Sequence, residues 1–187
     1  MRIISGKFKG RRFYPPAKNW PTRPTTDFAK EGLFNILRNQ FEFDEIKVLD
    51  LFCGTGNHSY EFISRGCTDV TCVDKFKGCI AFIKEIADKL EIEKELRVVR
   101  ADVFKFIASV RDTYDYIFAG PPYGLANMDS IPDLIFEHSL IKSGGWFVME
   151  HNPNHDYSGH PNFVEARHYG KTIFSIFTPT ALNSENE

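Results

Sequence analysis

The fold is decided by residues 48–57, VLDLFCGTGN, where an apolar run carrying one acid ends in a Gly-x-Gly turn. This pattern predicts a buried strand, a tight turn and then a helix around residues 57–65. The glycines let a ligand approach the backbone, and the start of the helix offers free N–H groups. A NAD fingerprint needs a third glycine where Ser59 stands, so the stretch predicts another kind of ligand loop. A strand–helix turn that binds nothing is the alternative.

The alternation of strand and helix continues along the chain. Short apolar runs lie at 70–73, 96–99, 114–118 and 146–149, and helices are predicted near 77–90, 103–110 and 130–141. Strands that alternate with helices predict βαβ units and a parallel sheet with helices on both faces. The end of the chain differs, because residues 163–169 and 172–177 flank Gly170 as in an antiparallel hairpin.

The N-terminal region has another character. Residues 1–14 place β-prone runs on either side of a glycine-bearing centre, which predicts a small hairpin. Residues 15–24 hold four prolines and are not expected to be helical. Thr25 or Thr26 is then expected to cap a helix that runs to about Asn39.

Composition and charge narrow the class of protein. With 187 residues, 42% hydrophobic and 26% charged, the chain suits one globular domain and not a disordered tail. No apolar run approaches a membrane span, and the first residues do not form a signal-peptide core. Residues 1–40 carry nine Lys or Arg against two acids, whereas the remainder carries 14 against 23. A basic arm on an acidic body indicates either a polyanion-binding element or a solvated basic face.

Cysteine and histidine spacing argues against a metal. The four cysteines form no CxxC pair, so free thiols in a reducing compartment are expected rather than zinc ligands or disulfides. The histidines show no ligand-like spacing, and no metal is predicted.

Acids follow three successive predicted strands. Asp50 lies on the first strand and suits a ligand ammonium group, while Asp74 ends the second and suits the two hydroxyls of a ribose. Asp102 follows the third strand. Each acid taken alone is equally compatible with an ordinary surface carboxylate. Because the carboxyl ends of parallel strands form one crevice, the three together indicate a ligand site.

The fourth strand ends in residues 118–123, FAGPPY. This resembles the (Asp/Asn/Ser)-Pro-Pro-Tyr motif of methyltransferases that act on exocyclic amino groups. An aryl amine is a weak nucleophile, because its lone pair is delocalised into the ring, and hydrogen-bond acceptors localise that pair. The resemblance implies that the Pro121 carbonyl is one acceptor and that Tyr123 stacks on a flipped base. Gly120 departs from the motif and offers no side-chain acceptor.

Further segments extend the resemblance over nearly the whole chain. They are MRIISGKFKGRR (1–12), RPTTD (23–27), KEGLFNIL (30–37), DLFCGTG (50–56), SRG (64–66) and the terminal YGKT (169–172). With the Pro-Pro-Tyr motif, this combination resembles the bacterial small-subunit rRNA guanine-N2 methyltransferases, the RsmD family. Each motif alone is common, but the combination is specific.

The resemblance implies an α/β, Rossmann-like class I methyltransferase fold, with a mostly parallel seven-stranded sheet, a C-terminal antiparallel hairpin and a small basic N-terminal hairpin. It implies methyl transfer from S-adenosylmethionine to the N2 amino group of a guanine in 16S rRNA, by a cytoplasmic monomer acting on a 30S particle or assembly intermediate. We expect an RNA-binding extension over residues 1–24, a methyltransferase domain over 25–183 and a frayed tail over 184–187.

The resemblance also assigns site residues. The catalytic segment is Gly120, Pro121, Pro122 and Tyr123. The residues expected to bind the cofactor, with Asp102 and its neighbour at the adenine amino edge, are Thr25, Asp50, Phe52, Gly54, Gly56, Asp74, Lys75, Asp102 and Val103. Those expected to bind RNA are Lys7, Lys9, Arg11, Arg12 and Arg23. Glu150 and His151 follow the fifth strand and either line the substrate side or are ordinary strand-end polar residues.

Two alternatives stay open. The Pro-Pro-Tyr motif also serves adenine-N6 and protein-glutamine methylation, although the basic arm favours nucleic acid. Gly120 also permits a catalytically weakened relative that binds cofactor and RNA.

Overall fold

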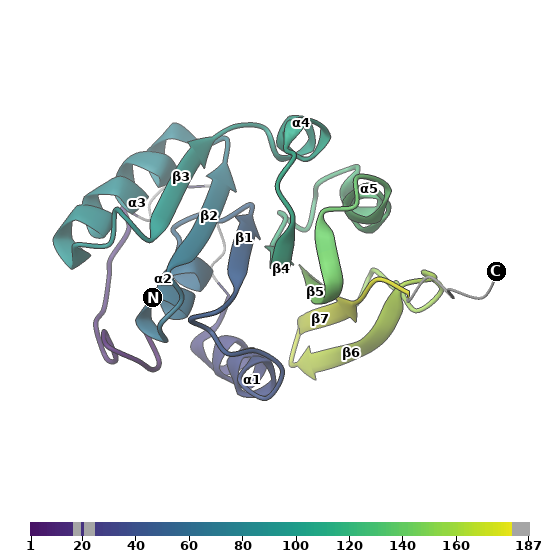
Figure 1. The fold of residues 1–187 in the computed structure, drawn as a ribbon, viewed down its shortest axis with the longest axis horizontal. Helices are drawn as coiled ribbons and strands as arrows, with labels where there is room; N and C mark the ends of the chain where they lie inside the picture. Colours follow the sequence, from purple (N-terminus) through teal and green to yellow (C-terminus); the bar gives the residue numbers. More distant parts are fainter. Residues whose placement is uncertain (17–19, 21–24, 181–187) are drawn as a thin grey trace.

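The structure is a computed structural model that describes residues 1–16, 20 and 25–180. A seven-stranded sheet in the order β3-β2-β1-β4-β5-β7-β6 forms its centre (Figure 1). The strands are β1 (Lys47–Leu51), β2 (Asp69–Asp74), β3 (Leu96–Arg100), β4 (Tyr114–Ala119), β5 (Ile141–His151), β6 (Phe163–Tyr169) and β7 (Thr172–Phe177). The helices are α1 (Asp27–Leu37), α2 (Asn57–Ser64), α3 (Lys77–Leu90), α4 (Val103–Ser109) and α5 (Ile131–Glu137), with a 3₁₀ turn at Met128–Ser130.

The sheet has the predicted mixed topology. β1 pairs in parallel with β2 and β4, and β3 and β5 continue the parallel part outward. β7 lies antiparallel between β5 and β6, which confirms the C-terminal hairpin. The strand order reverses between β1 and β4, and ligands of such sheets bind outside the carboxyl ends of the strands at this point.

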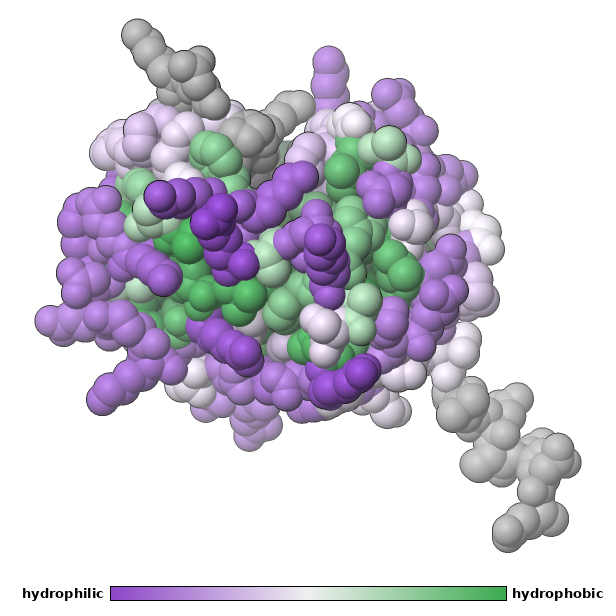
Figure 2. Space-filling view, turned by 90° about the horizontal axis from the view of Figure 1, so that it is seen from above, coloured by the Kyte–Doolittle hydropathy of each residue, from purple (hydrophilic) through white to green (hydrophobic). Residues whose placement is uncertain are grey.

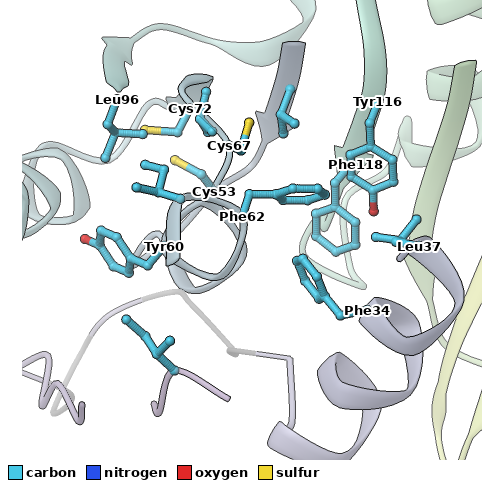
Figure 3. Packing of buried hydrophobic residues seen from close by; sticks show 14 of the residues in the cluster. Phe34, Leu37, Cys53, Tyr60, Phe62, Cys67, Cys72, Leu96, Tyr116 and Phe118 are labelled. Carbon is cyan, nitrogen blue, oxygen red and sulfur yellow. The ribbon is translucent and has the colours of Figure 1, made fainter. Parts of the chain in front are cut away.

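Two hydrophobic clusters cover the two faces of the sheet. Side chains of α1, α2 and α3 pack on one face, and those of α4 and α5 on the other. Figure 3 shows the first cluster, in which Phe62 of α2 points towards Tyr116 and Phe118 of β4. The Phe34 and Phe62 rings lie 4.7 Å apart between centroids. All four cysteines are buried and free.

The helix predicted over residues 130–141 is wrong at its end. α5 stops at Glu137, the chain turns through Ser139 at a φ of 52°, and β5 begins at Ile141. The sequence hides this start, because residues 142–145, KSGG, look like a loop. Ile141 pairs with Tyr114 of β4, and regular pairing resumes only at Trp146, so residues 142–145 form an irregular stretch within the strand. The Lys142 ammonium lies 2.8 Å from the Asp115 carboxylate of β4.

The N-terminal hairpin is present, with a single antiparallel bridge between Arg2 and Arg12. The Ile3 N–H donates to the Arg11 carbonyl at 3.0 Å. Thr26 caps α1 by accepting from the Ala29 N–H, and the helix ends at Leu37, two residues earlier than predicted. The tail at 184–187 and most of the proline-rich linker lie outside the described residues.

Within the described chain, no helix is long and apolar enough to cross a membrane. Figure 2 shows one face of the molecule, on which hydrophilic side chains surround hydrophobic residues near the centre.

Candidate active site

A cavity of about 780 Å³ lies at the carboxyl ends of β1, β2 and β4, which is the size range of small-molecule sites. It brings together most of the residues that the sequence predicted to act. Those that line it are Thr25, Asp50, Phe52, Gly54, Asp74, Lys75, Asp102, Val103, Gly120, Pro121, Pro122 and Tyr123. Gly56 is not among the lining residues. It forms the turn immediately before α2, with a φ of 79°.

The loop between β1 and α2 is built from left-handed residues. Phe52 and Gly54 have φ angles of 56° and 53°. A Cβ on Gly56 would also lie 2.8 Å from the Tyr60 ring, so both conformation and space require glycine there. Left-handed Phe52 is unusual for a bulky residue, and such backbone strain concentrates at functional sites.

Asp50 is buried at the floor of the cavity. Its Oδ2 accepts from the Ser59 hydroxyl at 2.6 Å and from the Ser59 N–H at 3.2 Å. Its Oδ1 is buried and has no hydrogen-bond partner among the described residues. Burial raises the pKa of the Asp50 carboxyl to about 7, against the hydrogen bonds from Ser59. An unpartnered buried acceptor beside a cavity suits a ligand that brings an ammonium group.

Asp74 and Asp102 each have a structural task as well. Asp74 accepts from the Gly54 N–H at 3.0 Å and from the Phe76 N–H at 2.8 Å, so it braces the glycine loop. Asp102 caps α4 by accepting from two N–H groups of the first turn. Sequence spacing placed both acids at strand ends but did not reveal these contacts, which depend on neighbouring loops.

The 118–123 segment meets β5 at the other side of the cavity. Tyr123 donates its hydroxyl hydrogen to Glu150 Oε1 at 3.0 Å, and the Thr25 hydroxyl donates to Glu150 Oε2. A Cβ on Gly120 would lie 3.1 Å from the Phe118 ring, which stacks on His58 with 3.8 Å between centroids. The Phe118 ring must therefore give by a few tenths of an ångström to admit a side chain at position 120.

Sequence reasoning left several cavity residues unassigned. Trp20 approaches from the proline-rich linker and packs edge-on against Phe76, with 5.5 Å between ring centroids. Asn57 and His58 enter from the first turn of α2. No local pattern distinguished these side chains from ordinary core and linker residues.

The candidate RNA-binding residues lie away from this cavity, on the N-terminal hairpin. Lys7, Lys9, Arg11 and Arg12 are all exposed, and Arg23 lies outside the described residues. The Lys7 ammonium and the Arg11 guanidinium lie over the Phe8 ring, 5.0 and 5.4 Å from its centroid. The hairpin thus presents a compact group of cations.

A buried ion pair anchors this hairpin to the site. The Lys30 ammonium lies 3.1 Å from Glu61, and both side chains are fully buried. Glu61 also accepts from the Ile4 and Ser5 N–H groups at 2.8 and 3.0 Å. Lys30 donates to the Asn57 side chain at 2.8 Å, so one network joins the hairpin, α1 and the helix after the glycine loop.

The sheet order, the left-handed glycine loop and the acids at neighbouring strand ends define a class I methyltransferase, whose cofactor is S-adenosylmethionine. The chain belongs to one family of these enzymes, since residues 1–178 match the family model Conserved hypothetical protein 95, the RsmD family.

Particular relatives agree with this assignment. YlbH of Bacillus subtilis (strain 168), described provisionally as an rRNA methyltransferase, is 36% identical over 155 residues, 81% of this chain and 83% of its own. Ribosomal RNA small subunit methyltransferase D of Buchnera aphidicola is 31% identical over 150 residues, 80% of this chain and 75% of its own. A solved structure of yhhF from Escherichia coli, described provisionally as a methyltransferase, matches in fold with a TM-score of 0.82, 22% identity and coverage of 95% and 97%.

The chain's own residues fit this cofactor. The unpartnered Asp50 Oδ1 suits its ammonium group, and the carboxylates of Asp74 and Asp102 line the same cavity. The part of the chain that is described holds no group of three His, Cys, Asp or Glu side chains arranged for a metal ion.

Cofactor affinity is expected to fall as the pH is lowered from 7 to 5. The raised pKa of Asp50, about 7, means that its carboxyl becomes neutral in this range and loses its attraction for the ammonium group. An α-amino group, with a pKa of about 8, stays charged. We expect a loss of up to about tenfold per pH unit in calorimetry. The Asp50→Asn variant should bind with a flatter pH profile, and an equally flat wild-type profile would contradict this account.

Proposed function

We propose that this protein transfers a methyl group from S-adenosylmethionine to the N2 amino group of a guanine in 16S rRNA. The observation that carries the proposal is the Pro121-Pro122-Tyr123 segment, which lines the same cavity as the acids predicted to bind the cofactor. The relatives named for small-subunit rRNA methylation support the substrate class.

The protein acts mainly by positioning its substrates. When bound, S-adenosylmethionine supplies an electrophilic methyl group. The Pro121 carbonyl accepts one hydrogen of the guanine amine, and the half-buried Tyr123 ring stacks on the base. Holding the amine in line with the methyl group supplies most of the acceleration.

The direct test is to incubate the purified protein with labelled S-adenosylmethionine and small subunits that lack the modification, and then to map the labelled base. Label on guanine N2 in 16S rRNA is the expected result. Label on an adenine favours the adenine-N6 alternative, and bound but unmethylated subunits favour the weakened relative.

The same assay also compares assembled particles with naked 16S rRNA as substrates. We propose a monomer that acts in the cytoplasm on a 30S particle or assembly intermediate, with residues 1–24 as an RNA-binding extension of the domain at 25–183. Faster methylation of particles than of naked 16S rRNA is expected.

Replacing Lys7, Lys9, Arg11 and Arg12 together with Ala is expected to weaken rRNA binding and to flatten its salt dependence. Each lost phosphate contact lowers the slope of log affinity against log salt by about 1. The measurement is a salt titration of binding, with cofactor affinity unchanged. A control removes the same number of charges elsewhere, at Lys84, Lys89, Lys94 and Arg97. Equal slopes for the two variants would mean that the hairpin is only a solvated basic face.

A further inference from the structure

We propose that Glu150 supplies the hydrogen-bond acceptor that Gly120 lacks, and that it is a catalytic residue of this enzyme. The inference rests on the proposed function, because it concerns how the target amine is held during methyl transfer. It departs from the motif, in which the acceptor side chain stands at the position of Gly120.

The register of the sheet places Glu150 beside Gly120. β4 and β5 run in parallel with Phe118 opposite Val148 and Ala119 opposite Met149, and Gly120 and Glu150 each follow that last pair by one residue. Neighbouring strands lie about 4.8 Å apart, and partners in register point to the same face. Glu150 therefore projects from the next strand to the side on which a side chain at position 120 would lie.

Burial and contacts hold the Glu150 carboxylate in the site. Glu150 is 6% exposed and lines the cavity with Pro121 and Tyr123. One carboxylate oxygen accepts from the Thr25 hydroxyl and the other from the Tyr123 hydroxyl. A carboxylate offers about four acceptor positions in total. The hydrogen bond from Tyr123 holds the Glu150 carboxylate in a fixed position relative to the Tyr123 ring, on which the base stacks in the proposed function.

The packing around Gly120 explains why the acceptor belongs on β5. A side chain at position 120 would press on Phe118, which is only 4% exposed and stacks on His58. Glycine removes that conflict. Glu150 stands on the neighbouring strand and lines the same cavity as Gly120.

The chemistry of the step is balanced. The amine nitrogen bonds to the methyl carbon, the carbon–sulfur bond breaks with its electron pair left on sulfur, and one amine proton passes to the Glu150 carboxylate. The Pro121 carbonyl accepts a hydrogen bond from the other amine hydrogen. A preorganised acceptor of this kind is typically worth roughly 10²–10³ in rate.

The test is single-turnover methylation of unmodified small subunits by the wild type, Glu150→Gln, Tyr123→Phe and the pairs Gly120→Asp/Glu150→Gln and Gly120→Asn/Glu150→Gln. We expect Glu150→Gln to slow methylation roughly 10²-fold. At least one pair should recover tenfold or more, because it restores an acceptor at position 120. Tyr123→Phe should lose less than tenfold. Calorimetry with S-adenosylhomocysteine and a filter-binding assay with 16S rRNA should give affinities for Glu150→Gln within threefold of wild type.

The outcomes separate the two hypotheses. If the wild type methylates guanine N2 and Glu150→Gln does so within threefold of its rate, this inference is overturned while the proposed function stands. Failure of both pairs to recover rate, or a loss in Tyr123→Phe equal to that in Glu150→Gln, would make Glu150 a structural support and would also overturn it. Affinities of Glu150→Gln for S-adenosylhomocysteine or 16S rRNA that differ more than threefold from wild type would also overturn the inference. A wild type that does not methylate guanine N2 overturns both.

Discussion

Replacing Glu61 with Ala is expected to lower the free energy of unfolding by about 3–5 kcal/mol, the usual effect of removing one partner of a buried ion pair. The Lys30 ammonium, fully buried, would lose its counter-charge. The Ile4 and Ser5 N–H groups would lose their acceptor in the same change. The deficit should shrink as the pH rises towards the usual pKa of lysine, about 10.4. Burial already lowers the pKa of Lys30, and without the opposing charge of Glu61 the amine loses its proton more readily.

The matched control is Glu85→Ala. Glu85 pairs with Lys89 on α3, and these two side chains are 59% and 60% exposed. An exposed pair of this spacing contributes about 0.3–0.5 kcal/mol. Urea unfolding at several pH values measures both variants. Similar losses in the two would show that the buried network contributes no more than a surface pair.

Replacing Gly6 with Ala is expected to lift the N-terminal hairpin from α2. Gly6 has a φ of +83°, and a Cβ there would lie 1.7 Å from the backbone oxygen of Ser64. The chain must move, which breaks the hydrogen bonds that Ser64 accepts from the Lys7 and Phe8 N–H groups at 2.7 and 3.0 Å. We expect a loss of about 3 kcal/mol or more in stability from strain and overpacking together.

The variant Gly10→Ala separates the effect of backbone strain from the effect of overpacking. Gly10 has nearly the same φ, +84°, but a Cβ there would have nothing within 4 Å. Gly10→Ala therefore introduces only the strain of a left-handed backbone, which lowers stability by roughly 1–2 kcal/mol. Unfolding and rRNA binding are the measurements. Gly6→Ala should weaken rRNA binding more than Gly10→Ala, because it displaces the cations of the hairpin. Equal effects of the two variants on rRNA binding would contradict the idea that contact with α2 positions these cations.

Much of the architecture follows from local signals in the sequence. Residues 48–57 predict a strand, a tight turn and a helix, because apolar runs and glycines limit the backbone to few conformations. The acids after three strands converge because parallel strands end at one edge. The hairpin at 163–177 follows from its own turn. By contrast, β5 begins earlier than predicted, because Ile141 already pairs with β4 ahead of the irregular stretch that holds the glycines.

The sequence by itself determined the order of elements, the family, and the group of cavity residues that includes Asp50, Asp74 and Tyr123. Tertiary structure decided which of these side chains touch. The Lys30–Glu61 pair and the contact between Thr25 and Glu150 join positions far apart in the chain. The same holds for Glu150 and Gly120, which line one cavity although they lie far apart in the chain. No local pattern records such contacts, because they arise only when packing fixes the distance between separate elements.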